Sequence, residues 1–262
     1  SGDDLPPFQK AFFRNIVALV LVGGMMWRQG VSPKPEKGNW GCILGRAFFG
    51  TAGLLCNFYA IGHLVLADAN MLNKLSPFFA IVFSIFLLRE KPSAVQIGGV
   101  LVALAGSMLI IKPGFSSATF PAIIGLLGGM GAGAAYTCVR ALSQKGEKSA
   151  RIVFFFSMFS TLVCVPFMIT DYHPMTWGQF FCLIGAGASA ALGQFGVTLA
   201  YANAPAKEIS VFDYTQVIFS AILGFFLFGQ LPDGWSVLGY LLICGISVAV
   251  FFYNRNLERK GQ

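Results

Sequence analysis

Charged side chains are scarce in this sequence of 262 residues. Asp, Glu, Lys and Arg make up 11% of it, whereas a soluble globular domain carries about 25%, because its surface must face water. Hydrophobic residues make up 56%, and the mean hydropathy is +0.70. This composition excludes soluble, disordered and collagen-like chains, and it predicts a membrane protein with several spanning helices.

Motifs for metal, redox and hydrolytic chemistry are also missing. The six cysteines lie far apart in apolar stretches, and without a CxxC or Cys/His spacing they predict neither a zinc site nor a redox site. The two histidines, His63 and His173, have no Gly-x-Ser-x-Gly motif to accompany them. The glycine-rich stretch 129–134 lacks the βαβ context of a dinucleotide site. We therefore predict no enzyme, no metal and no cofactor.

Long apolar runs are what the sequence has instead. A spanning helix needs about 20 mostly apolar residues, with a range of about 17–25. We expect nine such helices, at residues 11–28, 41–61, 68–88, 94–111, 119–139, 152–170, 178–201, 208–228 and 235–253. The short connections between them leave no room for a soluble domain. The predicted fold class is an all-α, polytopic membrane helix bundle.

The two halves of the sequence match when one is shifted by 140 residues without gaps. Identical pairs along the shift include Gly45/Gly185, Gly53/Gly193, Ala60/Ala200, Phe79/Phe219, Pro92/Pro232 and Gly99/Gly239. Helix boundaries and loop prolines coincide under the same shift, which indicates two repeats, 1–112 and 113–262. Helix 119–139 has no counterpart in the first repeat. We therefore expect ten helices in a five-plus-five arrangement, with one N-terminal helix absent from this chain.

An odd number of helices in each repeat makes the second repeat inverted relative to the first. The charges agree with this arrangement: thirteen Lys and Arg residues fall on one side of the predicted membrane, and only Lys10 and Lys112 fall on the other. Positive residues mark the cytoplasmic side, so we expect a cytoplasmic C-terminus in a plasma or inner membrane. Topology thus accounts for the net charge of +7 without nucleic-acid binding.

A series of short polar motifs follows the helices of the first half. They are Phe12-Phe13-Arg14-Asn15, Asn57-Phe58-Tyr59-Ala60, Ala67-Asp68-Ala69-Asn70, Leu75-Ser76-Pro77-Phe78 and Arg89-Glu90-Lys91-Pro92. The series resembles the EamA-type branch of the drug/metabolite transporter superfamily, and the resemblance covers nearly the whole chain. It implies ten helices as inverted repeats, a central cavity, and transport of a small organic metabolite, often outward. The second half departs from it, with Gly229-Gln230 in place of Arg89-Glu90.

Four ionisable residues lie inside predicted spans: Lys74, Arg14, Arg46 and Asp213. Each such charge costs about 2.5–3.5 kcal/mol at the centre of a spanning helix, which makes it a candidate for function. Arg14 and Arg46 lie near helix ends, where snorkelling of the long side chain to the interface explains them equally well. Lys74 lies deeper, before the helix-kinking Pro77, and polar residues surround it in sequence: Asn70, Asn73 and Ser76.

The 140-residue shift places Asp213 on Asn73, next to Lys74. Two alternatives follow. In a substrate site, which we favour, Lys74 holds an anionic group while Asp213 takes an amine or a proton; in a structural pair, the two charges only stabilise the bundle. Other candidates for the cavity wall are Asn57, Tyr59, Tyr136, Gln194, Tyr201, Asn203, Tyr214 and Gln216. Each of these also fits a helix–helix hydrogen bond, typically worth about 0.6 kcal/mol.

Small residues recur at every fourth position in two predicted helices. They are Gly125, Gly129 and Gly133 in one, and Gly185, Ser189 and Gly193 in the other. Small residues at this spacing let two helices approach closely, so we interpret both series as packing surfaces.

These observations predict a secondary active transporter that exports small organic metabolites by alternating access. The expected solutes are amino-acid-like or other carboxylate-bearing molecules. Alternatives are a proton-independent exchanger or facilitator, a multidrug efflux carrier of the same fold, a channel, and a scaffold protein. The predicted partners are the substrate and the lipid bilayer, without nucleic acid, and a homodimer is left open. Asp213 is the predicted proton-coupling residue, and the predicted substrate-binding residues are Lys74, Asn73, Asn70, Ser76, Asn57, Tyr59, Arg14, Tyr214 and Gln216.

Overall fold

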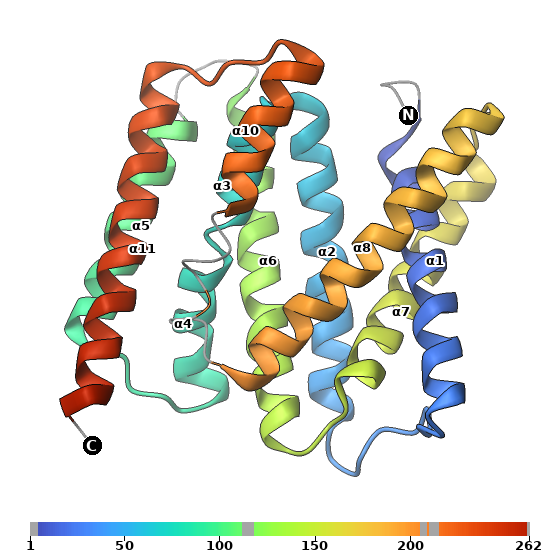
Figure 1. Cartoon of the computed structure of the whole chain (residues 1–262), viewed down its shortest axis with the longest axis horizontal. Coiled ribbons are helices and arrows are strands. Elements are labelled where there is room, and N and C mark those ends of the chain that lie inside the picture. Colours follow the sequence, from blue (N-terminus) through green and yellow to red (C-terminus); the bar gives the residue numbers. More distant parts are fainter. Residues whose placement is uncertain (1–4, 112–117, 205–208, 210–214, 261–262) are drawn as a thin grey trace.

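The described part of the computed structural model, residues 5–111, 118–204, 209 and 215–260, is helical with short connections and contains no strand (Figure 1). The helices are α1 (Pro7–Arg28), α2 (Trp40–His63), α3 (Leu66–Asn73), α4 (Ser76–Leu87), α5 (Ala94–Ile111), α6 (Thr119–Gln144), α7 (Ser149–Thr170), α8 (Trp177–Asn203), α10 (Thr215–Phe228) and α11 (Gly234–Lys260).

The predicted all-α membrane bundle is confirmed. Eight stretches of the described residues are long and apolar enough to cross a membrane, with α3 and α4 together forming one of them. Helix α10 is shorter, because the first residues of the expected span 208–228 lie outside the described part. The total of nine spans out of ten, in inverted repeats, stays a prediction.

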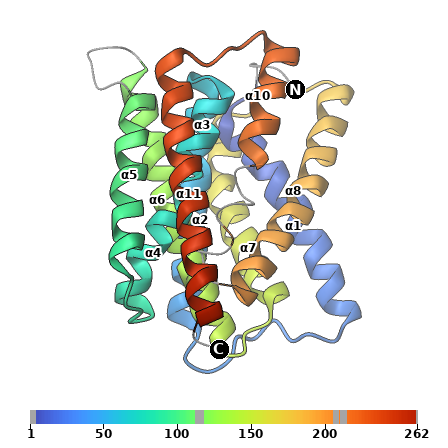
Figure 2. The ribbon, with the colours of Figure 1, turned by 60° about the vertical axis from the view of Figure 1, so that its left-hand side comes forward.

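Helices that correspond under the 140-residue shift run in opposite directions. In Figure 1, α5 rises from the bottom of the bundle while α11 descends beside it, and α2 rises while α8 descends. The chain likewise enters α1 from the top and α7 from the bottom. Three of the corresponding spans pack directly against each other: α1 against α7, the α3 part of segment 68–88 against α10, and α5 against α11. Figure 2 shows the last pair side by side.

Helix α6 packs against α2, α3 and α4, and its glycines permit the close approach. A Cβ atom on Gly133 would lie 2.6 Å from Cβ of Phe79 and 2.7 Å from the carbonyl oxygen of Ser76. A Cβ atom on Gly129 would lie 2.5 Å from the carbonyl oxygen of Leu72. The predicted packing role of this glycine series is therefore confirmed.

The second glycine series behaves differently. Cβ atoms added to Gly185 or Gly193 of α8 would have no described heavy atom within 4 Å. No described residue packs closely on these two positions, so their packing role stays a prediction. Helix α8 is also the least buried of the membrane-length helices. Only 17% of the residues in its most apolar stretch are buried.

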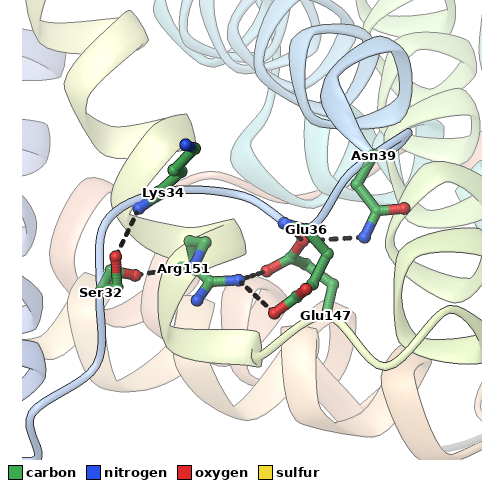
Figure 3. Close-up of polar contacts among 6 residues, drawn as sticks. All are labelled: Ser32, Lys34, Glu36, Asn39, Glu147 and Arg151. Atoms are coloured by element: carbon green, nitrogen blue, oxygen red, sulfur yellow. Dashed lines mark hydrogen bonds and ion pairs between the residues drawn. The ribbon is translucent and has the colours of Figure 1, made fainter.

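A buried ion pair ties the connection between α1 and α2 to the start of α7 (Figure 3). Glu147 is 5% exposed, pairs with Arg151, and accepts hydrogen bonds from Nδ2 of Asn39 (2.8 Å) and from the Glu36 amide (3.1 Å). Arg151 donates through Nε to the Ser32 carbonyl at 2.9 Å. Burial alone would raise the pKa of Glu147, but the hydrogen bonds and Arg151 lower it, so the carboxylate stays ionised.

We predict that Gly133→Ala destabilises the bundle, because its new methyl group collides with the backbone of α4, which cannot rotate away as a side chain can. Overpacking of this kind costs about 1–3 kcal/mol. The measurement is thermal unfolding of the purified protein in detergent. Gly185→Ala is the matched control, since its methyl group enters open space and should leave the midpoint unchanged. Equal midpoints for the two variants would contradict the packing role of Gly133.

Candidate functional site

A cavity of about 260 Å³ lies between α1, α2, α6, α7, α8, α10 and the end of α3. Its polar and aromatic lining consists of Arg14, Arg46, Asn57, Asn73, Lys74, Tyr136, Phe156, Gln194 and Gln216. Pockets for drug-sized ligands typically measure about 300–1,000 Å³, so this cavity suits a smaller metabolite. Among the described lining residues there are three cations and no carboxylate, which favours an anionic ligand.

Arg46 reaches into the cavity from α2. The side chain is 2% exposed, and its Cζ atom lies 4.2 Å from the centroid of the Phe156 ring. Its guanidinium also lies against the backbone of Gly50, one turn further along α2, where any Cβ atom would collide with Nη1. The side chain therefore extends away from the nearer end of its helix. Snorkelling, one of the two sequence-based interpretations, is wrong for Arg46.

Arg14 reaches the same part of the cavity from α1. Its Nη1 atom is buried, and it has no hydrogen-bond partner among the described residues; the same is true of Nε of Arg46. A small recess next to the main cavity is lined by Arg14, Phe156 and Gln194. Arg14 and Arg46 thus line one cavity, and both have donors that no described protein group accepts.

Lys74 lies at a break in the helix that the sequence predicted as continuous over 68–88. Helix α3 ends at Asn73, and α4 begins at Ser76, with Pro77 in its first turn. Proline fits a first turn but not a helix interior, because it lacks the amide proton that an interior position must donate. Lys74 is 8% exposed and follows the C-terminus of α3, where the carbonyl groups favour a positive charge.

Hydrogen bonds join α3 to the second half of the chain. Tyr240 of α11 donates to Oδ1 of Asp68 at 2.5 Å, and Gln216 of α10 donates to Oδ1 of Asn70 at 3.2 Å. The backbone amide of Leu66 donates to Oε1 of Gln230 at 3.0 Å. These contacts position the half-helix that carries Lys74 at one end of the cavity.

The structure brings together most of the predicted polar residues. Those that line the cavity are Arg14, Asn57, Asn73, Lys74, Gln216, Tyr136 and Gln194. Asn70 lies next to it through its bond to Gln216, and Tyr201 stacks on Tyr136 with ring centroids 4.2 Å apart. The predicted residues Asp213 and Tyr214 lie outside the described residues, so the proposed Lys74–Asp213 pair stays a prediction.

Three predicted residues do not line the cavity. The Tyr59 ring stacks on His63, at a centroid distance of 4.2 Å, because the two are one helical turn apart. Ser76 is 2% exposed at the start of α4, where its backbone meets Gly133. Asn203 is exposed at the end of α8 and donates back to the Leu199 carbonyl at 2.7 Å. Polar residues near a motif therefore do not all face the same side.

The sequence analysis did not include Phe156 or assign a binding role to Arg46. Phe156 is one of 27 phenylalanines, and nothing in its sequence neighbourhood distinguishes it from those that face lipid. A signal for Arg46 was present, because a glycine four residues after an arginine in a helix leaves room for the guanidinium. Among the described residues, no group of three or more metal-ligating side chains occurs.

A bundle of membrane-length helices around a cavity lined by cations defines a multi-pass membrane protein with room for a small solute. Comparison with known proteins identifies the class as membrane transporters. The chain belongs to the EamA-like transporter family, which matches residues 2–112 and 119–252.

Several relatives have named functions. The pseudopaline exporter CntI of Pseudomonas aeruginosa (strain UCBPP-PA14) is 33% identical over 248 residues, which cover 94% of this chain and 86% of that protein. The riboflavin transporter of Vibrio cholerae is 26% identical over 94% of this chain and 82% of its own length. A solved crystal structure has a TM-score of 0.70 at 18% identity, over 97% of this chain and 90% of that one. This last likeness concerns the fold alone.

We predict that Arg46→Met raises the unfolding midpoint by a few degrees in detergent. Methionine fills a similar volume, and the lost cation–π contact, worth about 0.5–2 kcal/mol, is smaller than the cost of about 2.5–3.5 kcal/mol for a charge inside a span. Arg28→Met is the control, because Arg28 is exposed at the end of α1. A midpoint several degrees below that of the wild type would show that Arg46 stabilises the bundle instead.

Proposed function

We propose that this protein is a secondary active transporter that exports a small carboxylate-bearing solute from the cell. The cationic cavity carries the proposal, because Arg14, Arg46 and Lys74 line one buried space. Desolvated guanidinium and ammonium groups bind carboxylates strongly, and they repel cations. The 33% identical exporter CntI supports the outward direction. A cationic lining also favours acids over the cationic solutes of a multidrug efflux carrier.

The coupling residue that we propose is Asp213, one helical turn or so into the expected span 208–228. A carboxylate in that position can take up a proton when the solute leaves, which would link transport to a proton gradient. A proton-independent exchanger or facilitator remains the second candidate function. Counterflow in proteoliposomes separates either carrier from a channel, since only a carrier exchanges labelled solute against unlabelled solute.

We further propose that the chain consists of two inverted repeats, 1–112 and 113–262, that rock against each other around the cavity. The matching helix bounds and the opposite directions of α5 and α11 support this arrangement. A tenth helix would pack on the open glycine face of α8, as α6 packs on α2 in the first half. A Cβ atom on Gly53 would lie 2.9 Å from the carbonyl oxygen of Gly128 in α6, whereas one on its counterpart Gly193 would have no described heavy atom of another element within 4 Å, which supports this placement.

The repeat arrangement predicts the side of the membrane on which two segments lie. A fluorescent protein that folds only in the cytoplasm should be active when fused after Gln262, and inactive when inserted in the connection after Phe228. The physical reason is the inverted second repeat, which turns that connection away from the positively charged side. Activity of both fusions would contradict the proposed topology.

We predict that Lys74→Met abolishes export while the protein still folds and inserts. The loss follows from removing one of the three cations of the cavity wall, the one at the end of α3, on a different element from Arg14 and Arg46. The measurement compares carboxylic acids released into the medium by cells with and without the protein, at equal amounts in the membrane. Arg28→Gln, outside the cavity, should release as much as the wild type. Unchanged release by Lys74→Met would exclude Lys74 as an anion-binding residue.

A further inference from the structure

We infer that Arg14 and Arg46 form one subsite that binds the two carboxylates of a dicarboxylic acid. This inference rests on the proposed transport of carboxylate-bearing solutes and narrows their class. It is separate from the role of Lys74, which lies on a different element at the end of α3.

Two arginine side chains carry unsatisfied hydrogen-bond donors. Nη1 of Arg14 and Nε of Arg46 are buried, and neither has a hydrogen-bond partner among the described residues. No ion pair joins either arginine to a described carboxylate. A buried charged group without a partner is costly, and proteins retain such groups where a ligand completes them. Both arginines line the same cavity, so one ligand can contact both of them.

Charge balance decides how many acidic groups the ligand carries. Two guanidinium groups that line one cavity repel each other in a medium of low dielectric constant. A single carboxylate would neutralise one of them and leave the other uncompensated. Two carboxylates on one solute neutralise both, and each can accept the paired N–H donors of one guanidinium.

The position of Arg46 is fixed before the ligand arrives. Its Cζ atom lies 4.2 Å from the centroid of the Phe156 ring, and its Nη1 atom occupies the space that a Cβ atom on Gly50 would need. A group held in its binding geometry loses little conformational entropy on binding, which raises affinity for a ligand of matching shape. The rest of the solute faces the amide side chains Asn57, Gln194 and Gln216 on the cavity wall. These groups suit hydroxyl, amine or amide substituents.

The test measures binding of matched acids to the purified full chain in detergent, by calorimetry. The probes are unbranched dicarboxylates from succinate to adipate, each with its monoamide, which keeps the length and removes one charge. The best diacid should bind at least about tenfold more tightly than its monoamide. Arg14→Gln and Arg46→Gln should each weaken diacid binding about tenfold and leave monoamide binding nearly unchanged, which removes the preference.

A second variant guards against misfolding of the arginine mutants. Gly50→Ala keeps both arginines but forces the Arg46 guanidinium out of its place, so it should also remove the preference. Arg28→Gln, at the exposed end of α1, should keep it. Equal affinity for diacids and monoamides would overturn the inference and leave the proposed function intact. Tighter binding of phosphate monoesters than of every diacid would also overturn it. If no acid binds at all, the proposed function fails as well.

Discussion

The structure depends on one constraint, which is that cations inside a membrane protein must have water, a carboxylate or a ligand near them. The described part of the protein gives Arg46 an aromatic ring and the space beside a glycine, and neither neutralises its charge, so a ligand is left to meet the constraint. The surrounding elements are arranged around this unpaired group. Helix α7 supplies Phe156, α1 brings Arg14 to the same cavity, and α8 contributes Gln194. The energy that this arrangement costs is available to a bound anion, because binding relieves the repulsion.

The broken helix serves the same purpose at the other end of the cavity. A continuous helix over 68–88 would pair its interior backbone groups within the helix. The break at Lys74 instead creates a helix end, and the last carbonyl groups of α3 lie at this end. The glycines of α6 leave room for the residues on both sides of the break. The hydrogen bond from Tyr240 to Asp68 holds α3 from the opposite side. Irregular backbone at membrane depth is tolerated where it lines a polar cavity, and Lys74 lies at that place.

Most of the fold could be predicted from the sequence, because each spanning helix must be apolar over a length set by the bilayer. The expected segment 94–111 coincides with α5, and the other described helices contain or overlap their expected segments. The site was predictable only in part. Polarity alone pointed to Arg14, Lys74 and Asn57, which line the cavity, but the sequence does not specify helix rotation, so it does not show that Tyr59 and Ser76 lie away from the cavity lining. Phe156 was missed because composition does not distinguish an aromatic ring that holds a cation from one that faces lipid.

The charges of the cavity are less symmetric than its backbone. Arg14, Arg46 and Lys74 all belong to the first half, and the 140-residue shift places them on Phe154, Ala186 and Tyr214. A repeat can keep its helix lengths and directions while its binding residues diverge. The helix lengths and directions depend on the bilayer, whereas the binding residues depend on the solute. Three cations repeated in the second half would double the charge in a space of about 260 Å³, which no small solute could neutralise. The asymmetry is therefore what a cavity of this size requires in order to bind an acid.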